Sequence, residues 1–106
     1  MTTYLIKETK EFKRNFNKLP ADIKKRFEIQ FRRILENPFS TGKPLGYKWF
    51  RELKNNIYRA YYLVYEQEVI VLLVTISDKK TQRYVINFIK KNRKLFESFV
   101  KEKKEL

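Results

Sequence analysis

Apolar residues recur along this chain at two different spacings, and the spacing changes twice. In the first third they recur every three or four residues, the period of a helix with one buried face. Pro20 interrupts this pattern, but proline suits the first turn of a new helix. A short β-prone stretch, Tyr4 to Ile6, comes before Thr9, which can cap the first helix. The pattern predicts a strand and then a helical hairpin, and the segment Asn37 to Tyr47 is predicted to be a loop because Pro38 stops the second helix.

The middle of the chain has the two-residue period of a strand with two different faces. Asn55 and Asn56 tolerate the backbone angles of a tight turn, and the polar residues Glu66 to Glu68 separate two β-rich runs. The run Val69 to Val74 is apolar at every position, which is typical of a central strand covered on both faces. The segment Phe50 to Ser77 therefore predicts a three-stranded antiparallel meander.

Beyond Asp78 the helical period returns and predicts one long terminal helix. Its apolar positions are Val85, Phe88, Ile89, Leu95, Phe96, Phe99 and Val100. The expected fold class is α+β, with an N-terminal strand, a helical hairpin, an antiparallel β-meander and a C-terminal helix. A chain of 106 residues is long enough for one core, so we expect a single domain over residues 1–106.

The charge of the chain points to a polyanionic partner. Lysine and arginine number 25 against 12 acidic residues, giving a net charge of +13, and such density favours nucleic acid or the ribosome. The alternative is that the lysine content reflects the source organism. The sequence has no cysteine, no stretch typical of a signal peptide and no apolar run long enough for a membrane, so we expect a cytoplasmic protein without a membrane partner.

The residue types restrict the possible chemistry. Histidine is absent, and the carboxylates show no paired or metal-ligand spacing, so we expect neither a metal site nor a cofactor. What remains is a set of basic and phenolic side chains near strand ends that can bind phosphate. The set consists of Lys48, Arg51, Lys54, Arg59, Lys79, Lys80, Arg83 and Tyr84.

Arg59 is the most informative of these residues, because it is expected in the middle of a strand among aromatic residues, where an unpaired guanidinium is costly. Either it forms an ion pair with Glu52 or Glu66, or it binds RNA phosphate. Lys79 and Lys80 follow the apolar strand and form either a solvated turn or a pair of phosphate donors; we favour the second.

The tyrosines have more than one interpretation as well. Tyr84 can stack on a base or exchange a proton, but packing is the commoner role for a tyrosine at the start of a helix. The four tyrosines of the middle segment resemble a stacking platform, yet at least half are expected in the core. They are Tyr58, Tyr61, Tyr62 and Tyr65.

Several stretches together resemble the RelE/ParE superfamily of toxins from toxin–antitoxin systems, across nearly the whole chain. They are Phe12 to Pro20, Asn37 to Leu45, Arg51-Glu52-Leu53, Tyr58-Arg59 with Tyr62, and Ile76 to Lys80. The resemblance implies the same order of elements as the periodicity. In the RelE branch it implies a toxin that enters the ribosomal A site and cuts messenger RNA through the ribose 2′-hydroxyl without a metal. It also implies a cognate antitoxin, besides ribosome and mRNA, as partner.

The resemblance also assigns roles to residues. Arg59 matches the arginine that stabilises the transition state, and Lys79 matches an arginine that acts on the leaving group; Lys80 and Tyr84 complete the expected catalytic set. The expected RNA-binding residues are Lys48, Arg51, Lys54 and Arg83.

The chain departs from the RelE branch at three positions. Two catalytic lysines of that branch fall on Phe50 and Glu52, and its helix tyrosine falls on Val85. Lys48, Lys54 and Tyr84 are near enough to substitute, and Glu52 is a possible structural partner of an arginine. The alternative is a ParE-like gyrase inhibitor, or a catalytically reduced relative that binds ribosome or nucleic acid. A third reading, an unrelated RNA-binding protein, would be favoured if the helical hairpin were missing.

Overall fold

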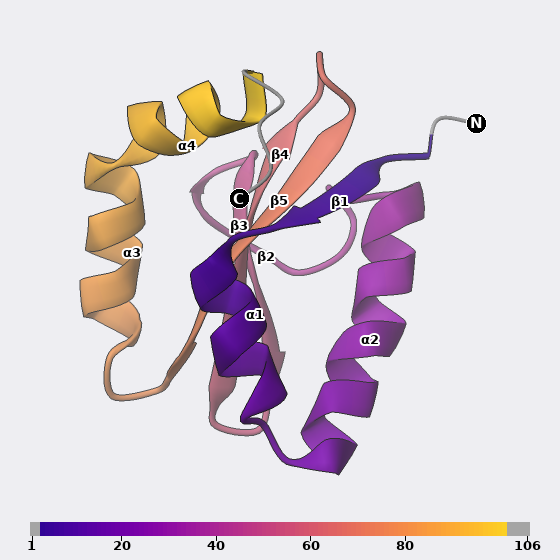
Figure 1. Cartoon of the computed structure of the whole chain (residues 1–106), viewed down its shortest axis with the longest axis vertical. Coiled ribbons are helices and arrows are strands. Elements are labelled where there is room, and N and C mark those ends of the chain that lie inside the picture. The colour runs from indigo at the N-terminus through magenta and orange to yellow at the C-terminus, as the bar shows by residue number, and fades with distance from the viewer. Residues whose placement is uncertain (1–2, 102–106) are drawn as a thin grey trace.

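The chain folds into a five-stranded sheet with helices on both faces (Figure 1). The computed structural model describes residues 3–101. The strands are β1 (Leu5–Glu8), β2 (Lys43–Tyr47), β3 (Phe50–Asn55), β4 (Tyr58–Tyr65) and β5 (Ile70–Asp78). The helices are α1 (Lys10–Asn17), α2 (Ala21–Glu36), α3 (Gln82–Lys91) and α4 (Arg93–Lys101). The α+β fold class, the helical hairpin and the antiparallel meander are confirmed.

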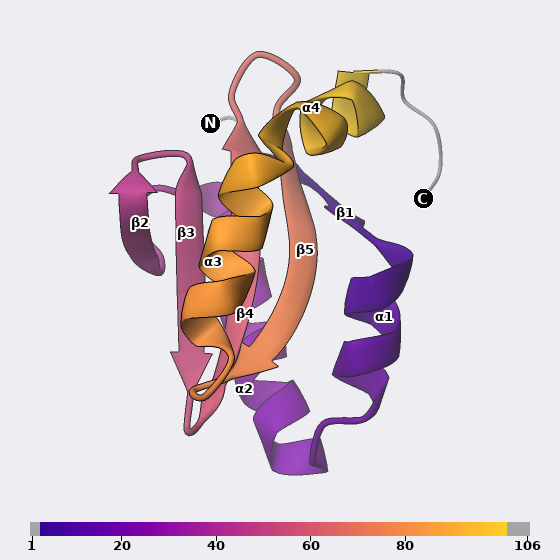
Figure 2. The ribbon, with the colours of Figure 1, turned by 90° about the vertical axis from the view of Figure 1, so that its left-hand side faces the viewer.

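The sheet has the order β1-β5-β4-β3-β2 and is mixed. Strands β3, β4 and β5 form the antiparallel meander, and β2 continues it on the β3 side. The first strand, β1, pairs in parallel with β5, so that Leu5 lies beside Ile70. Figure 2 shows β2 and β1 at opposite edges of this sheet.

The helical hairpin of α1 and α2 covers one face. Thr9 caps α1 as expected, since its hydroxyl accepts the Phe12 backbone N–H at 3.0 Å. The same hydroxyl donates to the Val74 carbonyl at 2.6 Å and so ties the start of α1 to β5. Phe12 and Phe27 are fully buried in the core between the hairpin and the sheet.

Helices α3 and α4 cover the opposite face, where Ile89, Phe96 and Val100 pack against Phe50 and other sheet residues. Strand β5 contributes to both cores, with Val71 and Leu73 on the hairpin side and Ile70, Leu72 and Val74 on the other. The expectation of a central strand covered on both faces is confirmed. No helix within residues 3–101 is both long and apolar enough to cross a bilayer.

The predicted loop from Asn37 to Tyr47 is partly wrong, because its second half forms β2. This strand is short, mostly exposed and irregular, with a register shift between Pro44 and Tyr47. Proline is tolerated at a sheet edge, where its missing N–H does not interrupt the ladder. An edge strand rich in proline and glycine lacks the apolar alternation that identifies an inner strand.

The single terminal helix is also a wrong prediction, since the helix breaks at Asn92. The Asn92 side-chain amide donates to the Phe88 carbonyl at 2.8 Å and competes with the helical ladder. The break changes the direction of the chain between Ile89 and Phe96, so the apolar residues of both helices reach the same core (Figure 2).

The turn before β5 differs from prediction by one residue. Val69 has a φ of 58° and belongs to the turn, so the strand begins at Ile70. A β-branched residue rarely adopts this left-handed conformation. The tight turn predicted at Asn55 and Asn56 is formed by Asn56 and Ile57, one residue later, with φ of 57° at Asn56.

Candidate functional site

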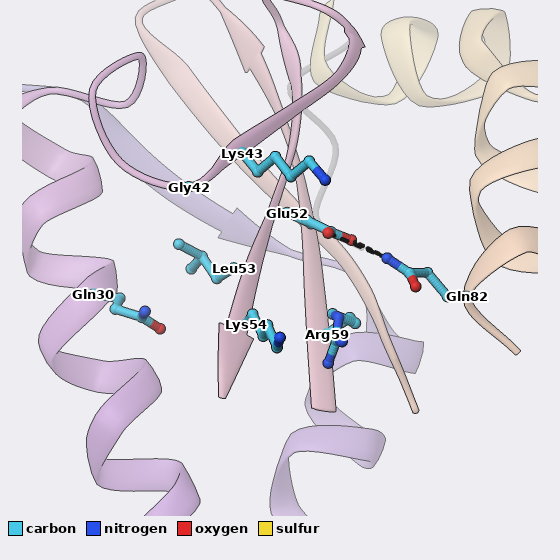
Figure 3. A pocket seen from close by; sticks show the side chains of 8 residues that line it. All are labelled: Gln30, Gly42, Lys43, Glu52, Leu53, Lys54, Arg59 and Gln82. Atoms are coloured by element: carbon cyan, nitrogen blue, oxygen red, sulfur yellow. Dashed lines mark hydrogen bonds between the residues drawn. The ribbon is translucent and has the colours of Figure 1, made fainter. Parts of the chain in front are cut away.

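A polar hollow of about 460 Å³ opens at the end of the sheet where β3 ends and β4 begins (Figure 3). Within residues 3–101, β2 pairs with β3 only as far as Glu52, which leaves the outer edge of β3 open beyond that point. The hollow is lined by Gln30, Gly42, Lys43, Glu52, Leu53, Lys54, Arg59 and Gln82. It therefore gathers three cations around one carboxylate.

Arg59 lies in this hollow with its side chain largely buried and only 6% of the residue exposed. Its Nη1 donates to the carbonyls of Asn56 at 3.1 Å and Tyr58 at 3.3 Å. The only salt bridge in the described part of the chain joins Glu97 to Lys101. The ion pair of Arg59 with Glu52 or Glu66 is therefore not formed there, and Arg59 is the second residue of β4 rather than a mid-strand residue.

The remaining donors of Arg59 face accessible space. A guanidinium has five N–H groups, and hydrogen bonds within residues 3–101 use only those of Nη1. Across the same residues, the one fully buried side-chain polar atom without a partner is Tyr65 Oη. The free Nε and Nη2 donors of Arg59 are therefore not fully buried, and Arg59 lines the hollow, where an anion can meet it.

Glu52 is a site residue that the sequence did not identify as such. It is 6% exposed, and its two carboxylate oxygens accept from the Gln82 amide at 3.2 and 2.9 Å (Figure 3). Arg51 and Arg59 both donate to carbonyls instead, so an arginine is not the partner of Glu52. Its position could have identified it as a site residue, because Glu52 occupies the place of a catalytic lysine in the RelE branch that the sequence resembles.

The hollow brings together some of the predicted residues. Lys54 and Arg59 line it and are paired across β3 and β4. Lys79 and Lys80 are exposed in the turn at the same end of the sheet, shortly after Ser77, the partner of Arg59 in β5. Arg83 lines a neighbouring hollow of about 330 Å³, which shares Gln82 with the first.

Tyr84 is 73% exposed on α3, so packing is the wrong interpretation for it. The following residue, Val85, is partly buried against the core, and Phe50 is fully buried in it. Of the four middle tyrosines, Tyr61 and Tyr62 are fully buried, which confirms that at least half belong to the core.

The turn that carries Lys79 and Lys80 is held by Asp78. The carboxylate of Asp78 accepts the Thr81 backbone N–H at 3.0 Å and the Thr81 hydroxyl at 3.1 Å. The hydrogen bond from the Thr81 backbone is the main reason why the pKa of Asp78 lies below its ordinary value. The turn thus has a defined shape, from which the two lysine side chains extend into solvent.

Arg51 and Lys48, like Lys79, Lys80, Arg83 and Tyr84, are not among the residues that line the hollow. Arg51 is 7% exposed and donates to the carbonyls of Thr41 at 3.1 Å, Lys48 at 3.2 Å and Gly42 at 3.1 Å. Its guanidinium fixes the loop before β2, which forms one wall of the hollow. Lys48 lies in the β2–β3 turn, at the other end of β3, with its ammonium 4.4 Å from the centre of the Phe39 ring.

Tyr62 holds the same loop from the core side. Its hydroxyl donates to the Pro38 carbonyl at 2.8 Å and is also in hydrogen-bonding contact with the Thr41 carbonyl. Burial raises the pKa of Tyr62 to about 12 from the ordinary value of 10.0. Arg51 and Tyr62 together therefore position the Gly42–Lys43 wall.

The raised pKa makes the stability of the fold sensitive to alkaline pH. Between pH 10.0 and about 12 the unfolded chain loses the Tyr62 proton while the folded chain keeps it, so stability falls as the pH rises. Tyr62→Phe should cost about 1 to 3 kcal/mol below that range, because the single hydroxyl proton that the Pro38 and Thr41 carbonyls share is lost. The difference in unfolding free energy between wild type and Tyr62→Phe should narrow as the pH rises from 10.0 to about 12, as measured by urea unfolding. A gap that does not change with pH would contradict the assignment.

No group of three or more acidic side chains in residues 3–101 is arranged to hold a metal ion.

Comparisons with known proteins place this fold. No protein-family model matches the sequence, and no curated protein matches it. The structure is similar to that of a free double mutant of the E. coli RelE toxin, with a TM-score of 0.66 and 17% identity over 80% of this chain and 90% of that one. It is also similar to chains of the toxin–antitoxin complex RelBE2 and of an archaeal RelE–RelB complex. For RelBE2 of Mycobacterium tuberculosis the TM-score is 0.61, with 23% identity over 74% of this chain and 93% of that one. For the archaeal RelE–RelB complex of Pyrococcus horikoshii the TM-score is 0.54, with 24% identity over 74% of this chain and 96% of that one. The chain therefore has the fold of the RelE toxins.

Proposed function

We propose that this protein is the toxin of a toxin–antitoxin pair and that it cleaves messenger RNA on the ribosome without a metal. The observation that carries the proposal is Arg59, a buried guanidinium with free donors facing a basic hollow. A largely buried cation without an acidic partner is costly, and an anion that binds at its free donors would offset that cost. The net charge of +13 and the RelE fold support RNA as that anion.

The residues of the hollow supply the groups that 2′-hydroxyl attack requires. In this reaction the ribose 2′-oxygen bonds to phosphorus and the bond to the 5′-oxygen breaks, leaving a 2′,3′-cyclic phosphate and a 5′-hydroxyl. Arg59 and Lys54 stabilise the charge that develops on the phosphoryl oxygens. Glu52 is the only carboxylate that lines the hollow, and it accepts the proton of the 2′-hydroxyl.

A proton must also reach the leaving 5′-oxygen. Lys79 and Lys80 extend from the turn at the same end of the sheet, and a protonated lysine supplies that proton. Tyr84, exposed on the first turn of α3, is placed to stack on a base of the bound RNA, and Arg83 to contact its backbone.

Glu52→Gln should lower cleavage about 100-fold, because an amide cannot take a proton from the 2′-hydroxyl. The fold should persist, since an amide oxygen can still accept from Gln82. Single-turnover cleavage on programmed ribosomes measures the effect, with circular dichroism as the check on folding. Wild-type rates in a folded Glu52→Gln protein would remove Glu52 from the mechanism.

The proposed protein partner is an antitoxin. Two of the similar structures are the toxin–antitoxin complex RelBE2 and a RelB–RelE antitoxin–toxin complex from Methanococcus jannaschii. A chain with a net charge of +13 favours an antitoxin with a surplus of acidic residues at the contact.

The test is induced expression in a bacterial host, with growth followed in parallel with primer extension on a reporter message. Growth arrest with new cleavages in A-site codons supports the proposal. Arrest without cleavage would favour the second candidate, a relative that binds the ribosome or gyrase without cutting RNA. That candidate is favoured by Phe50 and Val85, because both pack in the core where the RelE branch is expected to have catalytic groups.

A further inference from the structure

A second hollow, of about 430 Å³, adjoins the first on the α2 side. It is lined by Gln30, Arg33, Glu36, Asn37, Ser40, Thr41 and Gly42. Gln30 and Gly42 line both hollows, so the two form one groove that runs from Arg59 past the open edge of β3 to the end of α2. In Figure 3, Gln30 extends from α2 toward the first hollow, and Gly42 lies on the loop beside it.

We infer that the second hollow is a binding subsite for one nucleotide of single-stranded RNA, next to the nucleotide whose phosphate meets Arg59. The inference deepens the proposed function and rests on its premise that Arg59 binds the RNA backbone. Every residue that lines the subsite is polar except Gly42, and the set combines a guanidinium, two amides and two hydroxyls with one carboxylate, that of Glu36, which can accept from a ribose hydroxyl or a base amino group. These groups hydrogen-bond to phosphate, ribose and base edges.

Arg33 is the group that meets the phosphate. It is exposed on the last turn of α2 and makes no salt bridge with any residue in the range 3–101. Its guanidinium therefore keeps its charge available at the far end of the groove from Arg59. A strand that contacts both arginines crosses the boundary formed by Gln30 and Gly42.

The boundary between the two hollows is suited to such a crossing. Gly42 has no side chain, and its backbone packs so tightly on β3 that an added Cβ would lie 2.7 Å from the Glu52 carbonyl oxygen. Gln30 uses its side-chain oxygen to accept from Asn55 at 2.7 Å. Its amide nitrogen has no partner within the described residues and can donate to a base or a ribose.

The volume and the donor set favour a nucleotide over a bare phosphate. A hollow of about 430 Å³ accommodates a base, and Asn37 adds a second amide beside Gln30. Amides can recognise the edges of unstacked bases, so Asn37 is the residue expected to give the subsite its base preference.

The test measures binding of fluorescein-labelled 2′-O-methyl oligonucleotides to the purified protein, so that RNA cleavage and the ribosome play no part. Arg33→Ala should weaken binding roughly tenfold and reduce the slope of log affinity against log salt by about 0.7, the value for one lost phosphate contact with a single strand. Arg32→Ala is the matched control, because Arg32 is the exposed neighbour of Arg33 on α2 and lines neither hollow. Arg32→Ala should leave the affinity for the probes and the salt slope close to the wild-type values.

A second variant tests the base contact. Asn37→Ala should leave the salt slope unchanged and reduce the difference in affinity among the four homopolymeric probes. Equal effects of Arg33→Ala and Arg32→Ala would overturn the inference, as would a wild-type protein that does not bind the probes. Neither result decides the proposed function, which is tested by the cleavage assay. A wild-type protein that binds the probes through Arg33 but does not cleave messenger RNA would reject the proposed function and retain the subsite.

Discussion

Arg59→Ala is expected to lower cleavage of ribosome-bound messenger RNA about 1,000-fold or more. The substitution removes the only buried cation of the hollow, and an arginine that stabilises a phosphoryl transition state contributes on this scale. Single-turnover cleavage on programmed ribosomes is the measurement, and growth arrest should be lost in parallel.

Two controls separate chemistry from folding. Arg59→Lys keeps the charge but not the planar fork, so an intermediate rate is expected. Because Arg59 is 6% exposed and its Nη1 serves two carbonyls, its loss also removes a structural contact. The urea midpoint of each variant must therefore be compared with that of wild type. Cleavage at the wild-type rate by a folded Arg59→Ala protein would refute the assignment.

The second large effect is expected at Gly42, where alanine should destabilise the fold by about 3 kcal/mol. Its φ of +77° is unfavourable for a residue with a Cβ, and that Cβ would lie 2.7 Å from the Glu52 carbonyl oxygen and 2.9 Å from the Tyr62 hydroxyl. A backbone carbonyl in a paired strand cannot move away easily. The change should appear as a lower urea midpoint at constant slope.

Gly46→Ala is a matched control, because Gly46 has a similar φ of +89° but much more room. The nearest atom to its added Cβ is the Lys90 Nζ at 3.5 Å, the end of a flexible side chain. The variant should cost only about 1 kcal/mol, the backbone part of the penalty. Equal losses for the two glycines would mean that the loop at Gly42 shifts to accept the methyl group.

Much of the fold follows from local patterns. Thr9, Pro20 and Asn56 mark element ends through their own backbone chemistry, and the apolar periods identify the elements between them. Strand β2 and the break at Asn92 were missed for a different reason. Pairing of a proline-containing edge strand, and a helix bend that directs two apolar faces at one core, depend on the rest of the molecule.

The site was predictable in part. The basic residues near strand ends could be identified from the sequence, and Lys54 and Arg59 do meet in one hollow. The sequence could not predict that Arg59 is buried or that Glu52 contacts Gln82 across 30 residues. It also could not predict that Arg51 holds the loop before β2. Each depends on which neighbours the tertiary structure brings within hydrogen-bonding distance, and a single sequence holds no direct record of that.

The parallel pairing of β1 with β5 restricts when this protein can complete its fold during synthesis. Leu5 to Glu8 are made before the helical hairpin and the meander, yet their partners are Ile70 to Leu73. Until β5 has left the ribosome, the helical hairpin has only part of its sheet to pack on, and long-range pairing of this kind slows folding. The hollow also needs Gln82, which is made later still. A nascent chain therefore cannot form the complete site before Gln82 has left the ribosome, so the activity proposed for the finished protein has to wait until all of these segments have been made.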